Sequence, residues 1–265
     1  MSPTPLNTLA QTLKSLHAPG HPLVLTNTYD ALTARIIASS PIAPALATAS
    51  YAIAASAGLS DDALDLSTNL AGIRAIAAVA KESKKPLTAD FQDGYGERLE
   101  EGVRELIGAG VVGMNLEDYG REKAALYDID TACERIRSVL RTASDLGVPD
   151  FVVNGRTDAL LHGGSIADAV ERGNAYLAAG ATTVFVWGGR ERGGISREEV
   201  KQLVEAFGGM LNVSLRLDEA DEKGGRNLTR QELAEMGVAR ISVGPGLQAK
   251  AMAAFRREAE KVLEG

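Results

Sequence analysis

The chain of 265 residues contains one cysteine, Cys133, and this scarcity excludes an internal disulfide framework. A single thiol is typical of a reducing compartment, so we expect the protein to be cytoplasmic. Cys133 lies inside a predicted helix and is followed by the charged residues Glu134 and Arg135, which favours a structural role for it. The three histidines, His17, His21 and His162, lie away from the ends of the predicted strands. The sequence therefore argues against a zinc site and against a histidine-dependent catalytic triad.

Long apolar runs and clustered basic residues are also missing. No segment approaches the roughly 18 consecutive apolar residues that a membrane-spanning helix requires. Residues 1–20 are polar and interrupted by prolines, and residues 263–265 are no peroxisomal tripeptide, so we expect no targeting segment. The formal net charge of −7, with scattered Lys and Arg, argues against a nucleic-acid partner. We expect a globular protein with neither membrane nor nucleic acid as partner.

The sequence does contain a regular alternation of short apolar runs and segments with helical periodicity. Eight apolar runs predict strands, at 23–26, 45–50, 86–90, 111–116, 151–155, 183–186, 211–215 and 240–243. Helices are predicted at 31–38, 67–83, 97–108, 131–146, 166–179, 196–207, 229–236 and 247–263, with a short one before them at about 6–16. Two of these helices begin with capping-box patterns, Thr131…Glu134 and Ser196…Glu199.

Three segments, GAGVVG, AAGATTVF and EMGVARISV, share a layout in which a helix ends at a glycine turn and a buried strand follows. Eight strand–helix units without a linker to a second domain predict a closed (β/α)8 TIM barrel of the α/β class. The length suits such a barrel, and we expect residues 1–265 to form one domain. An open doubly wound sheet is the alternative.

The most informative stretch is 89–96, because it places acids at the carboxyl end of a predicted buried strand. The apolar run before it cannot continue through Gly94-Tyr95-Gly96, so the chain turns and presents Asp90, Gln92 and Asp93 at the strand end. Active sites of (β/α)8 barrels assemble at these ends.

Further acids occupy comparable positions: Glu117 and Asp118 follow the strand at 111–116, and Asp61 and Asp62 lie in the loop after 45–50. Carboxylates that converge in one cleft repel each other unless a cation or a shared proton offsets their charge. Oxygen ligands suit Mg²⁺, or Mn²⁺, better than zinc. The sequence therefore predicts a divalent-metal enzyme.

Several of these side chains have a second interpretation. Asp30, Asp61 and Asp158 are also good caps for the helices that follow them, and Asp93 is suited to shaping the Gly94 turn. Arg156 either bridges neighbouring barrel acids or anchors a substrate carboxylate in a bidentate manner, and we favour the anchor.

The two tyrosines near strand ends, Tyr29 and Tyr51, are compatible with a pocket wall or with the core. Trp187 follows the predicted strand 183–186. The polar residues Asn212, Ser214 and Arg216 alternate along and after the predicted strand 211–215.

Seven motifs in order carry a family resemblance: Asn27-Thr28-Tyr29-Asp30-Ala31, Ala54-Ala55-Ser56-Ala57-Gly58 with Asp61, Ala89-Asp90 with Gly94-Tyr95-Gly96, Asn115-Leu116-Glu117-Asp118, Arg156-Thr157-Asp158-Ala159, Leu211-Asn212-Val213 and Gly237-Val238-Ala239-Arg240-Ile241-Ser242. From about residue 20 to 255 the chain resembles the isocitrate lyase/phosphoenolpyruvate mutase superfamily. The resemblance implies a (β/α)8 barrel that forms a homo-oligomer, a dimer or a tetramer, with an exchanged C-terminal helix. It also implies a small 2-oxo or 2-hydroxy acid substrate bound to Mg²⁺.

Carried over by the resemblance, the site residues are as follows. Asp90 is expected to be the direct metal ligand, and Asp61 and Glu117 to hold the waters of the metal. The backbone at Ser50 and Tyr51 is expected to bind the substrate carboxylate together with Arg156. Asn212 and Ser214 are expected to line the far end of the pocket. We expect Arg156, Tyr29 and Glu117 to be the catalytic residues.

Departures from the superfamily pattern bear on the reaction. Gln92 and Ala49 stand where most or many members have Asp and Ser, and Trp187 replaces an acid that the lyases use. The loop 119–127 lacks the Cys and His of the isocitrate lyases, and no mutase-type Asn is evident in it. This loop is a plausible lid, whose Arg121 and Lys123 either reach a second acidic group of the substrate or are solvated.

Three functions remain open. The favoured one is a Mg²⁺-dependent lyase, decarboxylase or hydrolase that cleaves a C–C bond of an oxaloacetate-like 2-oxo dicarboxylate through an enolate. The second is a phosphonopyruvate- or phosphoenolpyruvate-type mutase or hydrolase acting on a C–P bond. The third is a catalytically silent homologue that binds a metabolite, which Gln92 and Ala49 suggest.

Overall fold

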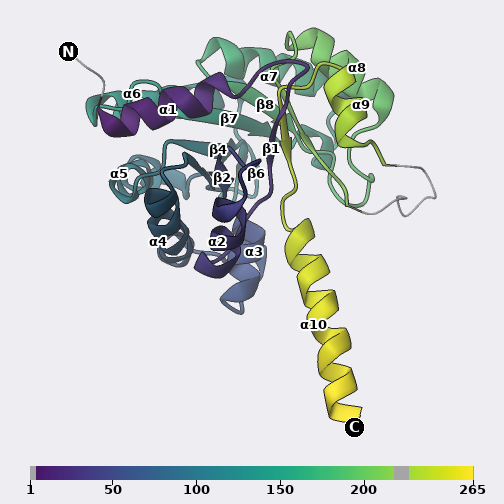
Figure 1. Ribbon diagram of the computed structural model, residues 1–265. Helices are drawn as coiled ribbons and strands as arrows, with labels where there is room; N and C mark the ends of the chain where they lie inside the picture. Colours follow the sequence, from purple (N-terminus) through teal and green to yellow (C-terminus); the bar gives the residue numbers. More distant parts are fainter. Residues whose placement is uncertain (1–3, 218–226, 265) are drawn as a thin grey trace.

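The computed structural model describes residues 4–217 and 227–264. Eight parallel strands form one sheet in the order β1-β10-β9-β8-β7-β4-β3-β2, and helices surround it (Figure 1). The strands are β1 Leu23–Leu25, β2 Leu46–Ala47, β3 Leu87–Asp90, β4 Gly113–Glu117, β7 Val152–Thr157, β8 Thr183–Val186, β9 Leu211–Ser214 and β10 Arg240–Ser242. Each expected strand is present, and the prediction of a (β/α)8 TIM barrel is confirmed.

The two ends of the sheet meet at Thr28 and Thr48, which form an isolated parallel bridge. The amide of Thr28 donates to the carbonyl of Ala47 over 2.7 Å, and the amide of Ala49 donates to the carbonyl of Thr28 over 3.1 Å. These two bonds join the β1 side of the sheet to the β2 side. The sheet therefore curls into a nearly closed barrel, and the alternative of an open doubly wound sheet is wrong.

All the helices expected from periodicity are found in the structure, with ends shifted by one or two residues in most cases. They are α1 Pro5–Ser15, α2 Ala31–Ser39, α4 Leu66–Ser83, α5 Leu99–Ala109, α6 Ile129–Asp145, α7 Ile166–Ala178, α8 Arg197–Ala206, α9 Arg230–Glu235 and α10 Gly246–Glu264. The capping box of Ser196 and Glu199 is confirmed. The one predicted at Thr131 is wrong, because Asp128 caps α6 and accepts the amide of Thr131 over 2.8 Å.

Two local elements were not expected. The predicted strand 45–50 ends early, and Ser50 begins the short helix α3, Ser50–Ser56. Its amide donates to the carboxylate of Asp90 and so takes no part in the sheet. The loop 119–127 contains a small antiparallel hairpin of β5, Tyr119–Gly120, and β6, Ala125–Leu126.

The barrel interior is partly polar. Asn154 donates to Asn115 over 2.8 Å, Thr183 donates to Asn154 over 2.6 Å, and Arg240 donates to Asn115 over 3.0 Å. Because β4 and β10 are not neighbours in the sheet, the last bond crosses the barrel. Buried polar groups require such partners, so this network fixes the floor beneath the strand ends.

The C-terminal helix α10 differs from the others because none of its residues is buried. It extends away from the barrel (Figure 1), and Phe255, Val262 and Leu263 are 71%, 82% and 85% exposed. Near its beginning, Gln248 donates to the carbonyl of Ala52 in α3 over 2.9 Å. In residues 4–217 and 227–264, no helix has the length and apolar content to cross a membrane.

Candidate active site

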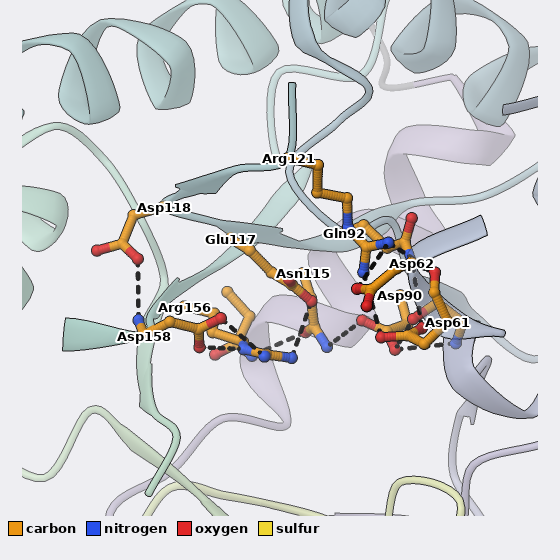
Figure 2. A network of polar contacts seen from close by, with 12 residues as sticks. Asp61, Asp62, Asp90, Gln92, Asn115, Glu117, Asp118, Arg121, Arg156 and Asp158 are labelled. Atoms are coloured by element: carbon orange, nitrogen blue, oxygen red, sulfur yellow. Dashed lines mark hydrogen bonds and ion pairs between the residues drawn. The ribbon is translucent and has the colours of Figure 1, made fainter. Parts of the chain in front are cut away.

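Asp90, the last residue of β3, is held by donors from two sides (Figure 2). Its Oδ2 accepts the amide and the hydroxyl of Ser50 over 2.9 and 2.8 Å. Its Oδ1 accepts Nδ2 of Asn115 over 3.2 Å, and the same Asn115 accepts a bond from the buried Arg240. A carboxylate oxygen can accept two hydrogen bonds. Oδ2 already accepts two, whereas Oδ1 accepts one and keeps a free lone pair.

The turn after β3 explains how the next side chains are placed. Gln92 and Tyr95 adopt left-handed backbone conformations, with φ of 52° and 61°, which are uncommon for residues other than glycine. Asp93 accepts the amide of Tyr95 over 3.0 Å, so the interpretation that Asp93 shapes the Gly94 turn is confirmed. The turn directs Nε2 of Gln92 to Oδ1 of Asp61 over 3.1 Å.

Arg156, near the end of β7, lies between two acids. Its Nε and Nη2 donate to the two oxygens of Asp158 over 2.7 and 2.9 Å, and its Nη1 donates to Glu117 over 2.8 Å. The guanidinium also lies 4.2 Å from the ring centre of Trp187. Arg156 thus bridges barrel acids, the alternative that the sequence left open, and its role as a carboxylate anchor stays a prediction.

Asp90, Glu117, Arg156 and Asp158 are named here the acid–arginine cluster. Burial raises the pKa of Glu117 to about 8, and Asp158 and Asp90 act in the same direction against Arg156. Burial opposes the charge of Arg156, but Asp158 and Glu117 outweigh it and raise the pKa of this guanidinium. The cluster thus places three carboxyl groups against one guanidinium, and burial disfavours the ionised form of Glu117.

Asp61 precedes the cluster in the chain and faces it from the loop after α3. Burial raises the pKa of Asp61, and Arg121 opposes this shift. Arg121 of the β5–β6 hairpin donates to the carbonyl of Asp61 over 2.6 Å and to its carboxylate over 3.2 Å. The alternative of a solvated Arg121 is therefore wrong, since its side chain is 20% exposed and bonded.

The structure resolves the other capping alternatives as well. Asp30 caps α2 by accepting the amide of Thr33 over 2.7 Å. Asp158 and Asp61 make no side-chain cap. Asp118 is buried and accepts the amide of Asp158 over 2.9 Å and the hydroxyl of Tyr176 over 2.7 Å, so it is a structural residue.

The remaining expected site residues are less closely connected. Among the described residues, no hydrogen bond links the side chain of Tyr29 to the acid–arginine cluster. Burial and the nearby Asp30 raise the pKa of Tyr29. Tyr51 is 50% exposed on α3. Asn212 is fully buried, and its Nδ2 has no partner in the described part of the chain. Ser214, one pleat further along β9, lines a cavity.

The residues present fit a cation bound mainly by one carboxylate. Within residues 4–217 and 227–264, no three Asp, Glu, His or Cys side chains are grouped so that they could hold a metal. Mg²⁺ typically retains several waters and binds through one or two carboxylates. The lone pair on Asp90 Oδ1, the buried Oε1 of Gln92 without a partner, and the raised pKa values of Asp61 and Glu117 agree with such a site.

Sequence reasoning did not identify Asn115 or the contact between Arg121 and Asp61 as parts of the site. Asn115 lies two residues before the end of β4, and its side chain points into the barrel as period-2 alternation with Glu117 permits. Arg121 and Asp61 are 60 residues apart in the chain, so no local sequence pattern predicts their contact.

Comparisons with known proteins identify the family of the chain. The family model of phosphoenolpyruvate phosphomutase matches residues 13–263. Oxaloacetate decarboxylase of Rhodopseudomonas palustris strain HaA2 is 33% identical over 172 residues, which cover 62% of this chain and 57% of that protein. This chain therefore matches less than two thirds of that curated relative.

Two solved structures have the same fold. A candidate phosphonomutase from Burkholderia cenocepacia J2315 is 33% identical, with a TM-score of 0.83 over 97% of this chain and 99% of that one. The structure of 2,3-dimethylmalate lyase, a member of the PEP mutase/isocitrate lyase superfamily, is 26% identical, with a TM-score of 0.81 over 99% of this chain and 88% of that one. The family match over nearly the whole chain shows that it belongs to the phosphoenolpyruvate phosphomutase family, within the PEP mutase/isocitrate lyase superfamily.

Proposed function

We propose that the chain is an enzyme that cleaves a C–C bond of a small, oxaloacetate-like 2-oxo dicarboxylate through an enolate, with Mg²⁺, or Mn²⁺, as cofactor. The observation that carries the proposal is the acid–arginine cluster at the ends of β3, β4 and β7, where one guanidinium faces several carboxylates. The name of the related oxaloacetate decarboxylase supports the substrate class.

The cation would be held by Asp90 through Oδ1, with Asp61 and Glu117 as acceptors for its waters. When bound there, Mg²⁺ would supply a Lewis acid that draws negative charge from the substrate oxygens. Ser50 keeps the Asp90 carboxylate in one orientation through Oδ2. A single fixed ligand is consistent with a site that leaves most coordination positions to water and substrate.

Arg156 would bind a substrate carboxylate by exchanging part of its contacts with Glu117 and Asp158. Bidentate pairs between Arg and a carboxylate are strong and directional, and the stack on Trp187 limits the positions that the guanidinium can take. The amide of Ser50 is already bonded to Asp90, so the amide of Tyr51, in the first turn of α3, is the one left for the substrate. Tyr29 remains a candidate for proton transfer.

The β5–β6 hairpin would cover the site as a lid. Arg121 already joins this hairpin to Asp61, and exclusion of water strengthens every electrostatic interaction with the developing enolate. The enolate can be protonated by water, which agrees with a hairpin loop that contains neither Cys nor His.

A C–P bond mutase or hydrolase is the second candidate, because this chain matches 99% of the length of the structure of a candidate phosphonomutase. A catalytically silent binding protein is the third, because Gln92 replaces a charge near the metal with an amide that bonds to Asp61.

The deciding experiment assays oxaloacetate and phosphonopyruvate side by side with Mg²⁺, and again with excess EDTA. We expect Mg²⁺-dependent loss of oxaloacetate, followed by its ultraviolet absorbance and by NMR of the products. Turnover of phosphonopyruvate alone would favour the second candidate. Binding of oxalate, an enolate mimic, without turnover of any 2-oxo acid would favour the silent homologue.

We also propose that the protein is a cytoplasmic homo-oligomer that exchanges α10 between subunits. The absence of buried residues in this 19-residue helix supports the exchange, because an amphipathic helix gains its stability mainly by packing. Light scattering should give the mass of a dimer or tetramer, and Phe255→Ser should lower it. A monomeric mass at micromolar concentration would contradict the exchange.

A further inference from the structure

A cavity of about 550 Å³ lies at the carboxyl ends of β8, β9 and β10, beside the first turns of α10. Trp187, Ser214 and Val243 form part of its wall. Arg156 stacks on the ring of Trp187 at 4.2 Å, so the cavity adjoins the acid–arginine cluster. No member of that cluster lines the cavity, which makes it a separate space next to the reaction centre.

The charged side chains in the cavity wall are all basic. Arg190, Arg216 and Lys250 contribute to it, and no Asp or Glu does so among the described residues. Arg190 and Arg216 form no ion pair within residues 4–217 and 227–264. Among the residues that the structure describes, these two arginines have no acidic partner, and a concave wall that carries them favours the binding of an anion.

A glycine-rich loop after β8 holds Arg190 at the wall. The amide of Gly194 donates to the carbonyl of Gly189 over 2.9 Å, and a Cβ on Gly188 would lie 2.2 Å from the carbonyl oxygen of Gly194. The loop is therefore closed on itself more tightly than other residues would allow. The side chain of Arg216 passes this loop, with its Cδ 4.0 Å from the position of a Cβ on Gly194.

The rest of the wall is largely apolar, and it includes Val186, Ile195, Leu215, Leu217 and Ala249. Cavities of roughly 300–1,000 Å³ accommodate ligands much larger than a four-carbon acid. A ligand that used the whole wall would place methylene or methyl groups against the aliphatic side chains and an anionic group against the two arginines.

We propose that this cavity binds a distal, alkyl-bearing part of the substrate, which ends in a second carboxylate held by Arg190 and Arg216. The substrate is then a 2-oxo or 2-hydroxy dicarboxylate longer or more branched than oxaloacetate. The proposal rests on the proposed function, since it places the first carboxylate at Arg156. Trp187 connects the two subsites, because its ring stacks on Arg156 and also lines the cavity.

The test measures binding by calorimetry, independently of turnover, in the presence of Mg²⁺. The probes are oxalate, which reports on the acid–arginine cluster alone, and the pair 2-oxoadipate and 2-oxohexanoate, which share a six-carbon chain. Only 2-oxoadipate carries the terminal carboxylate. We expect 2-oxoadipate to bind roughly tenfold more tightly, a difference of about 1.4 kcal/mol. Arg190→Met and Arg216→Met should each reduce this preference, and together they should abolish it.

Arg192→Met is the matched control, because Arg192 lies in the same loop but pairs with Glu199 over 2.6 Å outside the cavity. It should keep the preference, and all variants should bind oxalate like the wild type. Equal affinity of the wild type for the two six-carbon acids would overturn the cavity assignment. If inorganic phosphate displaced 2-oxoadipate and acetate did not, the proposal that the cavity binds a carboxylate would be wrong. If the wild type did not bind oxalate but still preferred 2-oxoadipate to 2-oxohexanoate, the result would count against the proposed function and not against the cavity.

Discussion

The barrel mouth has two halves of opposite electrostatic character. At the ends of β3, β4 and β7 the acids outnumber the one arginine, and each acid is fixed by hydrogen bonds (Figure 2). At the ends of β8, β9 and β10 the charged residues that line the cavity are basic, and Arg190 and Arg216 lack acidic partners among the residues described. The described side chains therefore suit a cation in the first half and an anionic group in the second.

The largest effect should come from removing the central acid of the first half. Asp90→Ala should lower turnover by roughly 10²-fold or more, the scale seen when a group that stabilises transition-state charge is lost, and it should weaken Mg²⁺ binding. Asp62→Ala is the control, because the side chain of Asp62 is fully exposed. Steady-state kinetics and titration with Mn²⁺ would measure both effects. Wild-type behaviour of the Asp90 variant would remove the basis for a metal in this half.

Removing the single arginine of the acidic half should weaken folding as well as substrate binding. Arg156→Met leaves Glu117 and Asp158 buried without their partner, and loss of one member of a buried pair typically costs about 3–5 kcal/mol. Urea denaturation would measure this loss. The double variant Arg156→Met/Asp158→Asn should recover part of it, because the amide carries no charge that needs the guanidinium. A stable single variant would mean that the acids do not depend on this contact.

The two halves should also differ in their response to pH. Folding raises the pKa of Glu117 from 4.5 to about 8 through burial, so between these values the folded state binds the proton that the unfolded state has released. The contribution of Glu117 to stability is therefore complete below about 4.5 and falls as pH rises towards 8, by up to about 1.4 kcal/mol per pH unit. Urea denaturation without metal would show this slope.

Glu117→Gln should flatten that slope, since the amide does not titrate. The preference of the basic half for 2-oxoadipate should stay constant from pH 6 to 8, because arginine remains protonated throughout. A preference that follows the same pH curve as the stability would show that the two halves are not electrostatically separate.

The smallest effect is expected at the hairpin that spans the acidic half. Arg121→Met removes the bonds to Asp61, and an ion pair whose partners are 20% and 35% exposed contributes about 1 kcal/mol. We expect a change of a few-fold in KM, with little change in the melting temperature. Lys123→Met is the control, because Lys123 contacts only the ring of Tyr127 at 5.4 Å among the described contacts. A large loss of stability would instead identify Arg121 as a structural residue.

The elements that sequence reasoning located correctly are those set by local pattern. Apolar runs followed by glycine turns are sufficient for the eight strands, and period-3.6 patterns are sufficient for the helices. The helix α3 was not predicted and the start of α6 was misplaced, because Ser50 and Asp128 are fixed by individual hydrogen bonds, one of which spans 40 residues to Asp90. The partners of Arg156 and Arg121 also depend on distant segments, so the sequence could name the charged residues but not their pairs.

The join between the two ends of the sheet has a consequence for how the barrel opens. Two backbone bonds connect the Thr28 and Thr48 segments, whereas five residue pairs connect β4 and β7. Regions with few backbone bonds exchange their amide hydrogens through small local openings. The join between these two threonines, directly beside Ser50, should therefore open more readily than the pairing of β4 with β7, and hydrogen exchange at the amides of Thr28 and Ala49 would measure that opening.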